Sequence, residues 1–210
     1  MKFFPSPSFF RGFAILATLS ALGFSPRALG QAKNPDTEKW SGACAIEFLG
    51  KSTLHDFKGK VNAAPFTLTV TNPDARGDAV LDAVIAVTAS KMDTDDEKRD
   101  AKMRECLEVE SHPKISVALS GLKIASTRAE WEGRLPKPSV IPFKLTTLGK
   151  TQRLDGTVES WSKKGETVTL VVTFPVSLKA SGITVPTVLG FIKVKDTIQV
   201  RATITLKPGA

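Results

Sequence analysis

The sequence predicts an all-β fold, a closed antiparallel β-barrel of about eight strands with one short inserted helix. After residue 40, apolar residues recur at every second position in most segments, as in half-buried strands. Clusters of Pro, Gly, Asn and Lys separate these segments, and a single segment has helical spacing. A two-sheet sandwich fits the same periodicity and stays open as the alternative.

The first 30 residues are typical of a cleaved export signal. Lys2 and Arg11 precede an apolar run over residues 12–24, and Ala28-Leu29-Gly30 supplies the small residues of a cleavage site. The run is too short to span a bilayer, and no later stretch approaches the ~20 apolar residues of a spanning helix. We therefore expect a periplasmic or secreted protein without a stable membrane anchor.

Charge and composition beyond the signal indicate one ordinary soluble domain. Loss of the three basic residues of the signal lowers the formal net charge from +8 to +5. The remaining basic residues alternate with acidic ones instead of forming a stripe with stacking aromatics, so we expect no nucleic-acid partner. Residues 31–39 are polar and are predicted to form a disordered leader, and residues 40–207 a single barrel domain.

Six segments show the alternation of strands most clearly. Their apolar rows are Ile46 and Phe48; Phe66, Leu68 and Val70; Ile115, Val117 and Leu119; Ile141, Phe143 and Leu145; Val168, Leu170, Val172, Phe174 and Val176; and Ile198, Val200, Ala202, Ile204 and Leu206. Turn signals occur at Asn72–Gly77, Arg134–Pro138 and Lys163–Gly165.

The inserted helix is predicted between the apolar rows that end at Val70 and begin at Ile115. Thr94 and Glu97 match a capping box, and good helix formers continue to about Leu107. Met103, Cys106 and Leu107 share one face, which we expect to pack against the sheet, while the charged residues of the segment stay in water.

Several blocks of residues 40–207, in order, resemble the YceI-like family. They are Ser52-Thr-Leu-His-Asp-Phe57, Ala89–Asp100, Leu107–Ile115, Gly182–Pro186 and Val194-Lys195-Asp196. The resemblance implies a lipocalin-like barrel whose cavity sequesters an isoprenoid lipid, either a polyprenyl quinone or a polyprenyl phosphate, with no other cofactor. Dimeric relatives imply a homodimer. The chain departs from many relatives in its Ser-Thr-Leu-His-Asp-Phe sequence and in Lys144–Lys150, which lacks their turn histidine.

Apolar side chains are the candidates for ligand binding. The chain has 12 Phe and no Tyr, a bias that favours dry apolar contacts. We predict that a lipid contacts Phe48, Phe57, Phe66, Ile115, Val117, Phe143, Leu170, Val172 and Phe174; the alternative is that these residues are ordinary core. Three basic residues near strand ends, Lys51, Lys58 and Arg153, are candidates for a head group, or else are solvated surface.

No set of residues indicates catalysis, and we predict that the protein is not an enzyme. His55 and Asp56 are adjacent, so on a strand their side chains point to opposite faces, and a structural turn explains them better than a general base. With only His55 and His112, the chain cannot form a histidine-rich metal site. A non-catalytic structural or stress-related barrel with a filled interior is the second functional hypothesis.

Cys44 and Cys106 are the only cysteines. Export would allow them to form a disulfide, which in the loop-entropy model stabilises the fold by about 4 kcal/mol. Two buried reduced thiols are the alternative, because the sequence does not give the Cα separation.

Overall fold

The computed structural model describes residues 36–72, 79–124, 139–184, 187–188 and 192–209. The predicted signal segment, residues 31–35 of the predicted leader and most of the turns at Asn72–Gly77 and Arg134–Pro138 lie outside these residues. The described strands are β1 Asp36–Gly50, β2 Phe57–Asn62, β3 Phe66–Asn72, β4 Ala79–Thr88, β5 Lys114–Ile124, β6 Val140–Thr147, β7 Lys150–Lys164, β8 Thr167–Ser177, β9 Thr187–Val188, β10 Ile192–Lys193 and β11 Thr197–Pro208.

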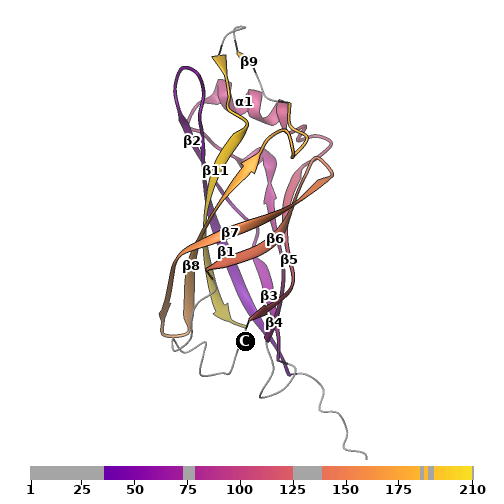
Figure 1. Ribbon diagram of the computed structural model, residues 1–210, viewed down its shortest axis with the longest axis vertical. Coiled ribbons are helices and arrows are strands. Elements are labelled where there is room, and N and C mark those ends of the chain that lie inside the picture. The colour runs from indigo at the N-terminus through magenta and orange to yellow at the C-terminus, as the bar shows by residue number, and fades with distance from the viewer. Residues whose placement is uncertain (1–35, 73–78, 125–138, 185–186, 189–191, 210) are drawn as a thin grey trace, which may run out of the picture. The chain divides into compact units, whose positions relative to one another are not determined.

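The large sheet closes on itself. Its strands follow the order β11-β8-β7-β6-β5-β4-β3-β1-β2, and β1 also pairs with β11, so the antiparallel sheet becomes a barrel (Figure 1). β3 and β2 pair with successive halves of one edge of β1 and together fill one strand position, which gives eight positions around the ring. The predicted barrel is therefore confirmed over the sandwich.

β1 starts earlier than the sequence indicated. Residues 36–39, predicted to belong to a disordered leader, pair with the second half of β3 in the register Asp36↔Asn72 to Lys39↔Thr69. This correction has a simple physical reason: β3 would otherwise present an unpaired edge next to β1.

The predicted apolar rows point into the barrel, where they form the main apolar cluster. Val70, Ala79 and Val168 are 4%, 0% and 1% exposed and belong to this cluster. They lie at the ends of β3, β4 and β8 that are distant from the helix. The most deeply buried strand residues thus include ones at that end of the barrel.

Glycine faces phenylalanine across the strands that flank β1. The three cross-strand pairs are Gly42↔Phe66, Phe48↔Gly59 and Gly50↔Phe57. A Cβ built on any of these glycines would lie within 2.8 Å of three carbons of the paired ring. Each ring therefore lies flat over the backbone of its partner, against the barrel wall, where only glycine leaves room for it.

The seam between β5 and β6 is short. Its described pairs are Ser116↔Thr146, Val117↔Leu145 and Ala118↔Lys144. The tight β6–β7 turn closes at Thr147↔Lys150, and this register turns the backbone nitrogen of Pro142 toward β5. Because proline has no N–H, it cannot continue the ladder there.

One α-helix, α1 Glu97–Cys106, is present among the described residues and lies across one end of the barrel (Figure 1). Its N-cap is Asp96, whose Oδ1 accepts a hydrogen bond of 3.0 Å from the backbone N–H of Arg99, so the predicted capping box starting at Thr94 is wrong. Thr94 is engaged elsewhere: its hydroxyl and its backbone N–H both donate to Asp100 Oδ1, at 2.5 and 3.0 Å. No helix of the described part of the chain has the length and apolar character to cross a membrane.

Candidate ligand-binding cavity

A cavity of about 940 Å³ runs along the barrel interior. It lies at the upper end of the range for small-molecule sites, about 300–1,000 Å³. Its wall consists largely of the apolar side chains that alternate inward along the barrel strands, and α1 contributes Met103, Cys106 and Leu107. The predicted inward face of the helix is therefore confirmed.

The cavity is long. On β11 the lining residues alternate from Ile198 to Leu206, which corresponds to about 27 Å along the strand and, at the usual barrel tilt, about 20 Å along the axis. A space of this length can accommodate an extended chain.

All nine residues predicted to contact a lipid line this cavity. They are Phe48, Phe57, Phe66, Ile115, Val117, Phe143, Leu170, Val172 and Phe174. Phe143 and Phe174 meet edge to face, with ring centroids 4.8 Å apart. The alternation of the strands thus brings these side chains to one space, and their contact with a ligand stays a prediction.

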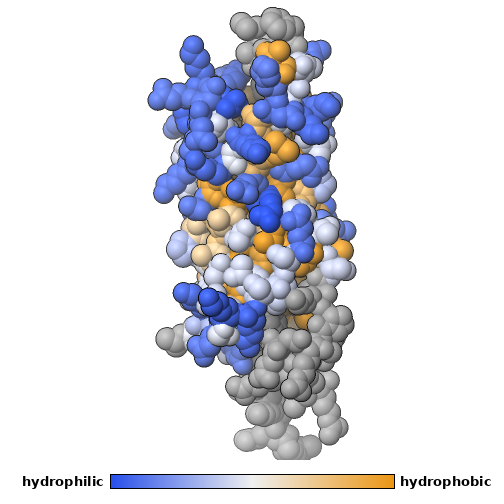
Figure 2. Space-filling model, turned by 90° about the vertical axis from the view of Figure 1, so that its left-hand side faces the viewer, coloured by the Kyte–Doolittle hydropathy of each residue, from blue (hydrophilic) through white to orange (hydrophobic). Residues whose placement is uncertain are grey.

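The three predicted head-group residues, Lys51, Lys58 and Arg153, do not line the cavity. All three are exposed. Lys58 follows the inward Phe57, so the strand alternation turns it outward, and the same applies to Arg153 beside the inward-facing row of β7. Figure 2 shows hydrophilic residues covering much of one outer face, with apolar residues in separate patches between them. The structure therefore places these three side chains outside the cavity, and a head-group role for them has no support from its geometry.

The charged residues of the cavity lining come from α1 instead. They are Asp96, Lys98, Arg99 and Lys102, and they are joined by Ser52, Leu54 and His55 of the β1–β2 turn. Leu54 is 58% exposed, so these two segments form the rim where the cavity meets solvent. We name this rim the mouth. Sequence reasoning missed its basic residues, although Arg99 precedes Met103 by one helical turn and so shares the predicted inward face.

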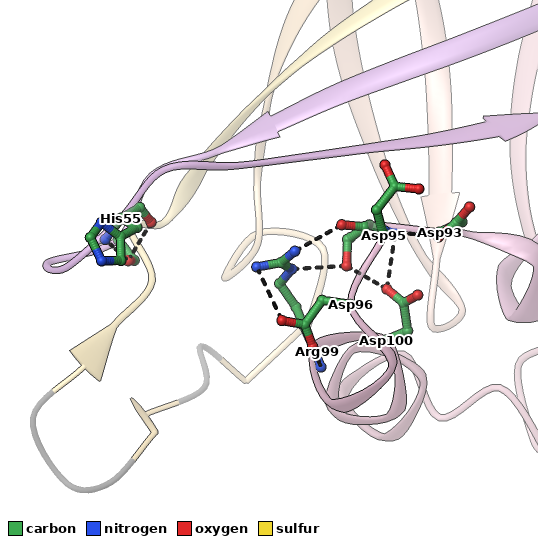
Figure 3. Close-up of polar contacts among 8 residues, drawn as sticks. His55, Asp93, Asp95, Asp96, Arg99 and Asp100 are labelled. Carbon is green, nitrogen blue, oxygen red and sulfur yellow. Dashed lines mark hydrogen bonds and ion pairs between the residues drawn. The ribbon is translucent and has the colours of Figure 1, made fainter.

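Arg99 is held in a fixed position at the mouth (Figure 3). Its Nε donates to Thr94 Oγ1 and its NH2 group to the Thr94 carbonyl, each at 2.8 Å. The guanidinium carbon lies 5.4 Å from the centroid of the Phe57 ring, within cation–π range. Its NH1 group is 3.9 Å from Asp96 Oδ2. Among these contacts, NH1 is the guanidinium nitrogen without a short hydrogen bond.

Beside this cluster, Lys60 forms ion pairs with the two carboxylates of Asp93 and Asp95. The Lys60 ammonium is 3.0 Å from Asp95 Oδ1 and 3.6 Å from Asp93 Oδ2. The pKa of Asp93 is lowered chiefly because its carboxylate accepts the backbone N–H of Asp95, and the pKa of Asp96 is lowered chiefly by the backbone N–H of Arg99. Backbone hydrogen bonds therefore keep both carboxylates ionised to a lower pH than that of an ordinary aspartate.

His55 belongs to a turn organised by Ser52. The Ser52 hydroxyl donates to the His55 carbonyl at 2.7 Å and accepts the backbone N–H groups of Leu54 and His55 at 3.3 and 3.1 Å. The backbone N–H of Thr53 donates to the Lys193 carbonyl at 3.0 Å and so ties the turn to the segment before β11. This geometry accounts for the residues without general-base chemistry.

The two cysteines are free thiols, so the disulfide left open by the sequence is not formed. Both line the cavity. Burial raises the pKa of the Cys44 thiol to about 11, and burial also raises the pKa of Cys106. In the part of the chain that the structure describes, no cluster of three or more His, Cys, Asp and Glu residues could hold a metal ion.

The fold and the cavity define an eight-stranded antiparallel barrel with a long apolar interior. A family model described as the YceI-like domain matches residues 42–206, and the chain belongs to this family. The crystal structure of BcnA from Burkholderia cenocepacia is similar, with 15% identity, a TM-score of 0.56 and coverage of 77% of this chain and 95% of that chain. A polyisoprenoid-binding domain from Saccharophagus degradans implicated in plant cell wall breakdown has 10% identity, a TM-score of 0.52 and coverage of 80% and 98%. A search of the curated proteins finds no match.

Proposed function

We propose that this protein binds an isoprenoid lipid in its barrel cavity and carries or sequesters it outside the cytoplasm without changing it chemically. The observation that carries the proposal is the cavity of about 940 Å³, long and lined by apolar side chains from all around the barrel. The similarity in fold to a polyisoprenoid-binding domain supports the same ligand class. The proposed location depends on the export signal expected from the first 30 residues.

The energetics of such a ligand depend on the length of its tail. Drug-sized ligands gain about 0.3 kcal/mol per non-hydrogen atom after the cost of ordering, so a tail of about 20 carbons contributes about 6 kcal/mol, a Kd of tens of micromolar. A tail of about 40 carbons contributes about 12 kcal/mol, a Kd near 1 nM. Affinity should therefore rise with tail length until the cavity is full and then reach a plateau.

The alternative of a structural barrel with a filled interior has less support. Most members of the main apolar cluster, such as Leu68, Leu170 and Leu206, line the cavity instead of filling it. Without a bound apolar ligand, each ring in the lining would lack van der Waals contacts on the side that faces the cavity. A bound lipid supplies those contacts.

The test begins with the protein purified from the extracytoplasmic space, extracted with organic solvent and analysed by mass spectrometry. The delipidated protein is then titrated with polyprenols of increasing length. We expect co-purifying isoprenoid lipid and an affinity that rises with length to a plateau. Absence of isoprenoids from every extract together with no binding of any polyprenol would refute the proposal.

A matched pair of variants locates the binding in the cavity. Ala202 is 7% exposed and lines the cavity, whereas Gln199 on the same strand is exposed and does not. Ala202→Leu should weaken polyprenol binding by reducing the space, and Gln199→Leu, which places the same new side chain on the outer face, should leave it unchanged. Circular dichroism and thermal melting establish that both variants are folded. Equal affinities for the two variants would place the lipid elsewhere.

A further inference from the structure

The mouth of the cavity has a charge that a neutral lipid does not need. Three basic side chains, Lys98, Arg99 and Lys102, line it together with one carboxylate, Asp96. The remaining polar groups of the rim are Ser52, which is committed to its turn, and His55. An interior of apolar side chains thus ends at an excess of positive charge, which is complementary to a ligand with an apolar tail and an anionic head.

We propose that Lys98, Arg99 and Lys102 form a binding site for an anionic, phosphate-type head group, so that the cavity takes an acidic isoprenoid lipid in preference to a neutral one. This inference rests on the proposed function, since the tail must occupy the cavity for the head to reach the mouth. The exposed Lys51, Lys58 and Arg153 have no part in it.

The position of these residues in α1 supports the inference. Lys98 and Arg99 lie in the first turn of a ten-residue helix. The helix dipole disfavours cations at this end, so intrahelical electrostatics do not account for their placement. Their charges instead add to the partial positive charge of the helix N-terminus, and both attract anions.

The carboxylates next to these basic residues already have hydrogen-bond or ion-pair partners. Asp96 accepts the backbone N–H of Arg99 at 3.0 Å and lies 3.9 Å from its guanidinium. The Lys102 ammonium is 2.8 Å from both carboxylate oxygens of Glu105. This surface pair is solvent-exposed and therefore weak, so a doubly charged head group can compete for the ammonium. Arg99, fixed by Thr94 and by the Phe57 ring, presents its NH1 group without further ordering.

The experiment compares three probes on the delipidated full-length mature protein: geranylgeraniol, geranylgeranyl monophosphate and inorganic phosphate. Trp161 lines the cavity, so its fluorescence reports a bound tail. We expect the monophosphate to bind about tenfold more tightly than the alcohol, with an advantage that shrinks as ionic strength rises. Inorganic phosphate alone should bind weakly, because it lacks the tail.

Two double variants with the same change in charge decide where the advantage arises. Lys98→Gln/Lys102→Gln should abolish most of the advantage of the monophosphate over the alcohol. Lys51→Gln/Lys58→Gln, which alters exposed residues outside the cavity lining, should leave both affinities unchanged. Arg99→Lys, which keeps the charge but removes the planar fork, should reduce the advantage by a smaller factor.

The outcomes separate this inference from the proposed function. Equal binding of alcohol and monophosphate, or an advantage that survives in Lys98→Gln/Lys102→Gln, overturns the head-group site and leaves the lipid cavity standing. Binding of neither lipid overturns both. Binding of inorganic phosphate as tightly as the monophosphate shows a site for free phosphate and overturns the assignment to a lipid head group.

Discussion

Gly59→Ala is predicted to push a phenylalanine ring into the cavity. A Cβ on Gly59 would lie 2.5 Å from Cε2 and 2.8 Å from Cε1 of Phe48, and nearer still to Cζ. Carbon atoms in contact are about 3.5–4.0 Å apart, so the ring must move by about 1 Å or more. The backbones of β1 and β2 lie behind the ring, and the open direction is the cavity.

The expected cost follows from two opposing effects. Overpacking costs about 1–3 kcal/mol, and replacing a strand glycine by alanine returns about 0.5–1 kcal/mol. We therefore expect the free energy of unfolding to fall by about 1 kcal/mol and the affinity for a long polyprenol to fall with it. In the background Phe48→Ala the clash is absent, so Gly59→Ala should become neutral or stabilising, with an interaction energy of about 1–2 kcal/mol between the two sites.

Urea unfolding of the wild type, both single variants and the double variant measures this cycle, and polyprenol titration measures the cavity. Gly42 and Gly50 provide repeats of the test, because each faces its own ring. An equal cost of Gly59→Ala with and without Phe48 would refute the argument from the ring. Destabilisation without any loss of lipid affinity would show that the ring moves away from the cavity.

Three further predictions concern single groups. Asp100→Asn should lower the free energy of unfolding by about 1–3 kcal/mol, because buried Thr94 loses a charged acceptor for two donors, as urea unfolding would show. The pKa of Asp196 is held below its ordinary 3.8, chiefly by the backbone N–H of Lys179. Its stabilisation is therefore complete above 3.8 and lost as pH falls through the folded-state pKa, so Asp196→Asn should melt earlier at neutral pH and converge with the wild type in acid. Cys44, with a pKa raised from 9.0 to about 11, should be alkylated by iodoacetamide about 100-fold more slowly than an ordinary thiol, as peptide mass spectrometry would detect.

The barrel and the lining of its cavity could be predicted because both depend on a local period of two. In β8 and β11 every second residue is apolar, Val172 and Val200 among them, and closure of the sheet turns each such row inward. β7 was less visible: among its inward positions are Gln152 and Gly156, which interrupt the apolar row. A strand with polar or small inward residues loses the signal that marks its neighbours.

The mouth could not be predicted because it depends on tertiary placement. Lys98 and Lys102 are exposed helical residues by pattern, and they line the cavity only because α1 lies across the barrel end. The N-cap was misassigned for a related reason: Thr94 and Asp96 are both good caps, and the buried carboxylate of Asp100 claims the hydroxyl of Thr94. The glycine–phenylalanine pairs required the register between β1 and its neighbours, which a single sequence does not give.

The shortened ladder at Pro142 makes the barrel wall mechanically uneven. β8 and β11 are joined over ten residue pairs, whereas β5 and β6 share three among the described residues. Local opening of the sheet should therefore occur first between β5 and β6. Amide protons of residues 116–118 and 144–146 should then exchange with solvent sooner than those of residues 198–206. If the proposed lipid leaves through the wall of the barrel, it should leave along the β5–β6 line.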